Sequence, residues 1–113
     1  MDYSVAMKEI HHIHKKDAPS GTAITLAEGI VENHHKVSDW SLDKAGSSII
    51  PILALREGEV PGTHIVSYRS GVDLLEVKHE AFSRDGFVLG AVLVAEWVQG
   101  KKGVFTMDDF LEN

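Results

Sequence analysis

The residues best suited to chemistry lie in one short segment, EIHHIHKKDAPSGTA, which runs from Glu9 to Ala23. Its first half holds three histidines and two lysines. An imidazole titrates near neutral pH, so His11 can donate or accept a proton there. The ammonium group of Lys15 can neutralise a carboxylate, or donate a proton where its surroundings lower its pKa. Composition alone leaves open the alternative of a solvated basic strand end.

The second half of the segment, DAPSGTA over residues 17–23, has the pattern of a helix start behind a proline turn. Pro19 disfavours helix at the residue before it, and Ser20 is a natural N-cap. The first backbone N–H groups of a helix lack helical partners and carry partial positive charge, and Gly21 lets a ligand approach closely. With the Thr22 hydroxyl, this start could bind a carboxylate or phosphate, although a plain helix cap has the same pattern.

A proton donor, a cation and an anion site within one segment suit the reduction of a dicarboxylate. A hydride would add to one substrate atom and a proton to its neighbour, while Lys15 and the helix start would hold the carboxylates. The residue types do not decide whether His11 or Lys15 donates that proton.

A metal site is the main chemical alternative for a chain with seven histidines. A strand would put His11 and His12 on opposite faces, and His79 does not begin a His-Glu-x-x-His motif because the fifth residue is Ser83. We therefore predict no metal site, and metal-dependent hydrolysis remains the weaker alternative. We interpret His64 as structural, with a hydrogen bond beneath the anion-binding loop as one way to satisfy it.

Composition and charge limit the partners that we expect. The chain has 113 residues, of which 43% are hydrophobic, so it can bury a single core. Its formal net charge of −6 argues against nonspecific nucleic-acid binding, which needs clustered Lys and Arg. No apolar run approaches the roughly 20 residues of a membrane span, and neither cysteine nor a signal-peptide pattern is present. We expect a cytoplasmic protein without a membrane or nucleic-acid partner.

Hydrophobic periodicity predicts the elements that must position these residues. The predicted strands cover residues 3–14, 49–56, 63–69 and 74–81, the last two forming a hairpin. The predicted helices cover residues 22–35 and 84–99, with a further helical turn at 107–111 and Gly100 as a C′ cap. Residues 36–48 are predicted as a surface connection. One face of the first strand should carry Tyr3, Val5, Met7, Glu9 and His11.

The order strand, helix, three strands, helix predicts an α+β fold, a small mixed sheet of about four strands with helices on one face. Pro51 suggests an edge or a bulge in the second strand. No strand is followed by Gly-x-Gly-x-x-Gly and a helix, so we expect residues 1–113 to be a single domain that lacks a dinucleotide-binding (Rossmann) fold. Because the chain begins directly in a strand, we expect that fold in an N-terminal domain absent from this chain.

Segment 9–23 resembles the signature of the dihydrodipicolinate reductase family, E-x-H-H-x-x-K-x-D-A-P-S-G-T-A, at every fixed position. Three later stretches are also similar to family patterns, and the resemblance runs from about residue 4 to residue 111. These stretches are LREGEVPGTHIV over 55–66, HEAFSR over 79–84 and GVFTMDDFL over 103–111.

The resemblance implies a substrate-binding domain of an enzyme that reduces a cyclic dicarboxylate in diaminopimelate and lysine biosynthesis. NADPH or NADH would be bound by the absent N-terminal domain, and the chain alone would be inactive. The resemblance also implies a homotetramer in which sheets join edge to edge, which would cover exposed strand edges. A noncatalytic assembly domain with the same fold is the second hypothesis.

The resemblance also implies roles for individual residues. His11 would be the proton donor or acceptor, with Lys15 as a second donor, and Asp17 would orient the loop. The residues that would bind substrate are His12, Ser20, Gly21, Thr22 and Arg84.

Overall fold

Five strands and three helices are formed within residues 2–112, the residues that the structure, a computed structural model, describes. The strands are β1 (Ser4–His11), β2 (Asp39–Ser41), β3 (Ile49–Arg56), β4 (Gly62–Arg69) and β5 (Leu74–Ala81). The helices are α1 (Gly21–Asn33), α2 (Asp85–Val98) and α3 (Met107–Leu111). Contacts divide the chain into two units at the Phe82–Ser83 boundary, and each is described by itself. That residues 1–113 form a single domain stays a prediction.

The α+β prediction is confirmed, with five strands in place of about four. The additional strand, β2, lies in the region that was predicted as a surface connection. It has only three residues, Asp-Trp-Ser, which is too short a stretch to show alternation. The first strand was predicted too long, because β1 ends at His11 and the chain then turns away from the sheet.

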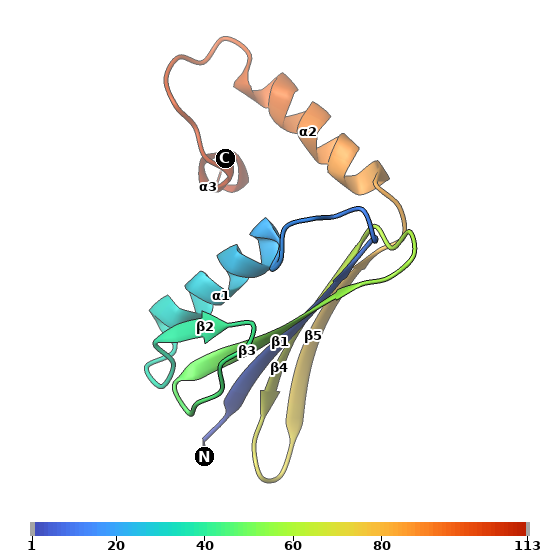
Figure 1. Cartoon of the computed structure of the whole chain (residues 1–113). Coiled ribbons are helices and arrows are strands. Elements are labelled where there is room, and N and C mark those ends of the chain that lie inside the picture. The colour runs from blue at the N-terminus through green and yellow to red at the C-terminus, as the bar shows by residue number, and fades with distance from the viewer. Residues whose placement is uncertain (1, 113) are drawn as a thin grey trace. The chain divides into compact units, whose positions relative to one another are not determined.

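The sheet of the first unit is mixed, with the order β2-β3-β1-β4-β5 (Figure 1). Strand β3 runs parallel to β1 and β2, whereas β4 runs antiparallel to β1 and β5. The carboxyl ends of β1 and β3 therefore lie at the same end of the sheet as the amino end of β4. The register places His11 beside Arg56 and Glu9 beside His64.

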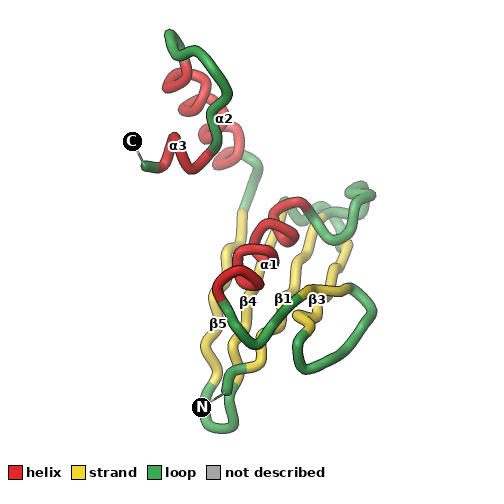
Figure 2. Tube along the Cα trace, turned by 90° about the vertical axis from the view of Figure 1, so that its left-hand side faces the viewer, coloured by secondary structure: helices red, strands yellow, loops and turns green. Residues whose placement is uncertain are grey.

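Helix α1 covers one face of this sheet, as Figures 1 and 2 show from two directions. The alternation predicted for β1 is confirmed, because its inward residues are buried and alternate with more exposed ones. The apolar core beneath α1 consists of Val5, Met7, Ala23, Ala27, Val37, Ile50 and Ile52. Glu9 and His11 continue the same buried row toward the carboxyl end of β1. The buried polar residues therefore lie directly next to the apolar core.

Pro51 does not mark an edge strand, so the first of the two predicted alternatives, an edge or a bulge, was wrong. Strand β3 lies inside the sheet, between β2 and β1. Pro51 is the last residue of β3 in register with β2, and the pairing with β1 begins at the next residue, Ile52. A missing backbone N–H disturbs the ladder least at such a change of partner.

The second unit contains α2 and α3. Gly100 has φ +78° directly after the C-cap residue Gln99, which confirms it as the C′ cap of α2. The ring of Trp97 lies 5.6 Å from that of Phe105 and 5.5 Å from that of Phe110, both edge to face. These contacts hold the segment after α2, residues 105–110, against that helix. That α2 covers the sheet stays a prediction. Within residues 2–112, no helix has the length and apolar character needed to cross a membrane.

Candidate functional site

A buried carboxylate, Glu9, lies at the centre of the candidate site. Its side chain is 1% exposed. Its Oε2 accepts a hydrogen bond from the backbone N–H of Ser20 at 3.0 Å, and its Oε1 forms an ion pair with Arg56. Burial by itself raises the pKa of the Glu9 carboxyl, but the hydrogen bonds from Ser20 and Arg56 outweigh burial and hold this pKa below its ordinary value. Glu9 is therefore ionised at neutral pH.

The imidazole of His11 lies between this carboxylate and Gly62. Its Nδ1 is 3.2 Å from Glu9 Oε2, close enough for an ion pair when the ring is protonated, but not directed as a hydrogen bond. On the other side, a Cβ atom at Gly62 would lie only 3.1 Å from His11 Nε2. Burial lowers the pKa of His11, and the Lys15 and Arg56 charges add to this, while Glu9 opposes it. His11 is therefore neutral at neutral pH.

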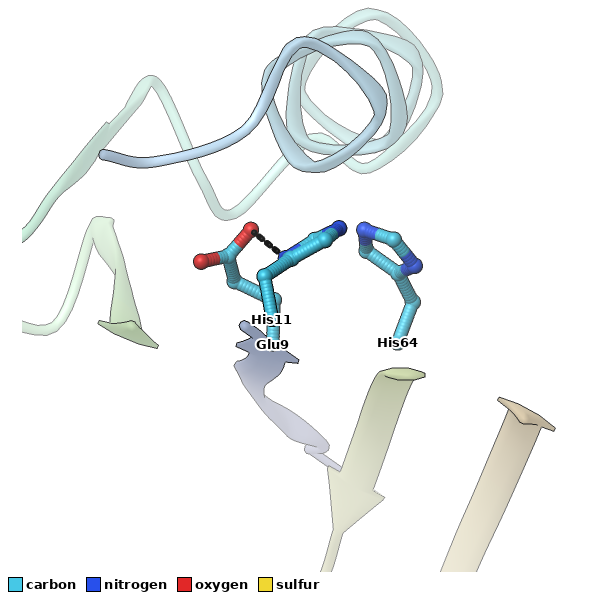
Figure 3. A group of neighbouring side chains, drawn as sticks. All are labelled: Glu9, His11 and His64. Carbon is cyan, nitrogen blue, oxygen red and sulfur yellow. Dashed lines mark ion pairs between the residues drawn. The ribbon is translucent and has the colours of Figure 1, made fainter. Parts of the chain in front are cut away.

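His64 of β4 completes the buried cluster shown in Figure 3, where the three side chains rise from the strands to the same side of the sheet. Its Nε2 lies 3.1 Å from Ser20 Oγ, and its ring is 5.1 Å from that of His11 in an edge-on arrangement. Burial lowers the pKa of His64, and the neighbouring His11 adds to this effect. The hydrogen bond expected beneath the loop is therefore present, and the purely structural role of His64 stays a prediction.

Arg56 joins the loop that follows β1 to the cluster. Its Nε donates to the carbonyl oxygen of Lys15 at 3.3 Å, and its Nη2 donates to the carbonyl oxygen of Asp17 at 2.5 Å. The side chains of Lys15 and Asp17 form an ion pair of 3.0 Å, as expected if Asp17 orients the loop. Sequence reasoning missed Arg56 and the contacts of Glu9. One available signal was that Arg56 is the only charged residue in the apolar stretch IIPILALR.

The start of α1 offers two unoccupied donors. Ser20 is confirmed as the N-cap, because its Oγ accepts from the backbone N–H of Ala23 at 3.2 Å. Its own N–H is taken by Glu9, so a contact between Ser20 and a ligand stays a prediction. Gly21 and Thr22 are exposed, and neither backbone N–H has an acceptor among residues 2–112. Two N–H groups and the positive end of the helix dipole are thus available to an anion.

Two predicted binding residues are not brought into the cluster. His12 follows the last residue of β1, is half-buried, and lies 5.9 Å ring to ring from His14. The predicted placement of His11 and His12 on opposite faces of a strand was wrong in this respect, because the strand ends between them. Arg84 is the N-cap residue of α2, in the second unit, and its role stays a prediction.

Glu9, His11 and His64 also form a group of three potential metal ligands, whose ligand atoms lie within 4.8 Å of one another. Sequence reasoning missed this group because His64 is distant in the chain. The donors are largely committed to other partners: the Glu9 oxygens to Arg56 and Ser20, and His64 to Ser20. A cation bound here would also share the carboxylate with the Arg56 guanidinium, so the donor set suits a hydrogen-bonded cluster better than a metal centre. That the chain holds no metal site stays a prediction.

Comparisons with known proteins agree with the resemblance in the sequence. The family model described as "Dihydrodipicolinate reductase, C-terminus" matches residues 1–111. A 4-hydroxy-tetrahydrodipicolinate reductase of Christiangramia forsetii is 54% identical over 99% of this chain and 47% of its own length. One of Archaeoglobus fulgidus is 38% identical over 98% of this chain and 47% of its own length. The chain thus spans about half the length of the curated relatives it matches.

A solved structure is similar in fold. It is described as dipicolinate-bound dihydrodipicolinate reductase from Paenisporosarcina sp. TG-14. The TM-score is 0.64 at 24% sequence identity, and the similarity covers 79% of this chain and 37% of that one. At this identity the likeness supports the α+β architecture.

Proposed function

This chain belongs to the dihydrodipicolinate reductase C-terminal family, and from that premise we propose that it is the substrate-binding domain of a 4-hydroxy-tetrahydrodipicolinate reductase. The complete protein would reduce a cyclic dicarboxylate with NADPH or NADH in diaminopimelate and lysine biosynthesis. One observation supports this most directly. A neutral His11 lies against an ionised Glu9, and the same Glu9 oxygen accepts from Ser20, the N-cap of the helix whose next two N–H groups have no acceptor among residues 2–112.

The substrate would be held by its carboxylates. The free N–H groups of Gly21 and Thr22 fit one carboxylate. The Lys15 ammonium supplies a positive charge whose only ion pair within residues 2–112 is with the exposed Asp17. Exchanging Asp17 for a substrate carboxylate would keep Lys15 paired. His12, Ser20 and Arg84 are proposed as further binding residues because of the family resemblance alone.

Reduction also needs a proton at the atom next to the one that receives the hydride. His11 suits this role because its Nδ1 lies beside Glu9, whose negative charge stabilises the imidazolium form. The ring can therefore take up a proton and release it at Nε2 without leaving a bare buried charge. Lys15 is the alternative donor. Comparing the pH profiles of His11→Gln and Lys15→Met variants would separate the two.

The hydride would come from a reduced nicotinamide, and this chain does not fit the dinucleotide that carries it. The connection from β1 to α1, residues 12–20, contains no glycine, whereas a pyrophosphate-binding turn needs several. We therefore propose that the cofactor is bound by an N-terminal domain outside this chain. Whether NADPH or NADH is preferred, and the cytoplasmic location, stay predictions.

The complete protein is proposed to be a homotetramer that assembles through sheet edges. Strand β5 is an edge of the described sheet, has eight residues, and exposes apolar side chains at Leu74, Leu75 and Val77. Such an edge is a template for pairing with another chain. Light scattering on the full-length protein should give four times the chain mass, and a Leu75→Lys variant should give a smaller species. A monomeric full-length protein would contradict the assembly but not the enzymatic proposal.

The function is tested with the full-length protein, its His11→Gln variant and the 113-residue chain alone. Oxidation of NADPH and of NADH is followed with the product of dihydrodipicolinate synthase as substrate. We expect turnover by the full-length protein, a loss of about 100-fold or more in the variant, and none with the chain alone. A His35→Gln variant, at an exposed histidine after α1, is the matched control and should retain activity. A full-length protein that oxidises neither cofactor would favour the assembly-domain hypothesis.

A further inference from the structure

The guanidinium of Arg56 is bonded both to the loop that carries Lys15 and to the buried Glu9 carboxylate. It donates to the carbonyl oxygens of Lys15 and Asp17 in the loop, and it forms the ion pair with Glu9 in β1. It also donates to the carbonyl oxygen of Leu55 in its own strand at 2.8 Å. None of the roles proposed above includes Arg56. The contacts nevertheless account for how the loop keeps its course after β1 ends.

The two loop contacts use the particular shape of the arginine side chain. Nε and Nη2 lie on the same edge of the planar guanidinium, and they hold carbonyl groups two residues apart. Lys15 lies at one of these carbonyls, so its backbone is anchored while its ammonium is free to change partner. Arg56 itself is about four-fifths buried, with 18% of its side chain exposed.

Glu9 connects Arg56 to the other two parts of the site, which are the start of α1 and His11. One oxygen is neutralised by Arg56, and the other accepts from Ser20 N–H at 3.0 Å and lies 3.2 Å from His11 Nδ1. The same carboxylate thus sets the position of the α1 start and faces the non-reacting nitrogen of the imidazole. A neutral residue here would leave Arg56 buried without its counter-charge, and an apolar residue would also remove the acceptor from Ser20.

We propose that Arg56 and Glu9 are positioning residues, which act as a pair to hold His11, Lys15 and the start of α1 in the geometry required for carboxylate binding and proton transfer. This inference rests on the proposed function, because it assigns how that same site is kept in order. Neither residue needs to touch substrate. Arg56 acts through the loop that carries Lys15, and Glu9 acts through His11 and Ser20.

The test compares two conservative variants in the full-length protein with two matched controls. Arg56→Lys keeps the positive charge opposite Glu9 but cannot bridge two carbonyls, so it is expected to fold. Glu9→Gln keeps the size and one acceptor but removes the charge. The controls are Arg69→Lys at an exposed position of β4 and Glu57→Gln in the exposed turn after β3. Thermal unfolding, kcat, KM and the pH profile of kcat/KM are measured for each.

For Arg56→Lys we expect a fall in kcat and a rise in KM, each of about tenfold or more, because displacing the loop affects both binding and proton transfer. For Glu9→Gln we expect the limb of the pH profile that belongs to His11 to move to lower pH. The reason is that the Glu9 charge raises the pKa of His11. The titratable or charged groups near His11 are Glu9, His12, Lys15, Arg56 and His64. A purely structural role would not move this limb.

The outcomes separate this inference from the proposed function. A wild-type protein without reductase activity removes the proposed function, and the inference with it. An active wild type whose two variants match the Arg69 and Glu57 controls overturns the inference alone. An Arg56→Lys variant that fails to fold also overturns it, because the pair would then be needed for the fold and not specifically for the site.

Discussion

The close contact between Gly62 and His11 yields the sharpest test of the site geometry. In a Gly62→Ala variant, the new Cβ would lie 3.1 Å from His11 Nε2 and 3.3 Å from its Cδ2. Ordinary carbon contacts are about 3.5–4.0 Å, so the ring would have to move by a few tenths of an ångström. It cannot move freely, because Glu9 lies 3.2 Å from its other nitrogen. Overpacking of this kind costs about 1–3 kcal/mol, and the φ of +159° at Gly62 adds backbone strain for any side chain, so we expect a loss of at least about 1 kcal/mol.

Urea denaturation of the chain and NMR titration of His11 would measure this effect. In the full-length protein, a displaced imidazole should reduce turnover by about threefold to tenfold, since a 1 Å misplacement costs about 100-fold. Gly29→Ala in α1 is the matched control, because its Cβ would meet no atom within 4 Å, and it should stabilise the helix by up to about 1 kcal/mol. A Gly62→Ala variant as stable as the wild type, with unchanged His11 titration, would refute the packing described here.

Three further expectations concern the same unit. Ser20→Ala should lower the free energy of unfolding by about 1 kcal/mol in urea, because α1 loses its N-cap, and a Thr replacement should recover much of it. Ile50→Ala should lower the free energy of unfolding by about 2–5 kcal/mol because this side chain is fully buried. Leu53→Ala, at a 54% exposed position, is the control, and an equal effect there would contradict the core assignment. Burial lowers the pKa values of His11 and His64 below 6.5 in the folded state. Below about pH 6.5 the unfolded chain therefore binds more protons than the folded chain, and the free energy of unfolding should fall as the pH drops. His11→Gln should flatten this dependence between pH 7.5 and 5.5; an unchanged slope would show that His11 does not titrate with folding.

Several features of this protein could be derived from local patterns in the sequence. Alternation along β1 placed Val5, Met7, Glu9 and His11 on one face, and the structure buries that row. The turn before Ser20 identified the N-cap of α1, because capping depends on a side chain and a backbone N–H only three residues apart. The bounds predicted for β3 and β5 match the structure, since both strands are bordered by turn residues.

The family resemblance directed attention to His11 and Lys15, but it did not show how they are held. That information depends on strand register. Glu9 and Arg56 are 47 residues apart, and Ser20 and His64 are 44 apart, yet both pairs are in contact. The strand β2 and the interior position of Pro51 likewise became apparent only from the sheet order. Periodicity and caps act within a few residues, so the sequence by itself determined most of the elements and the buried face of β1. Only the tertiary structure decided which charges meet, because ion pairs between distant strands exist only after the sheet has been assembled in one register.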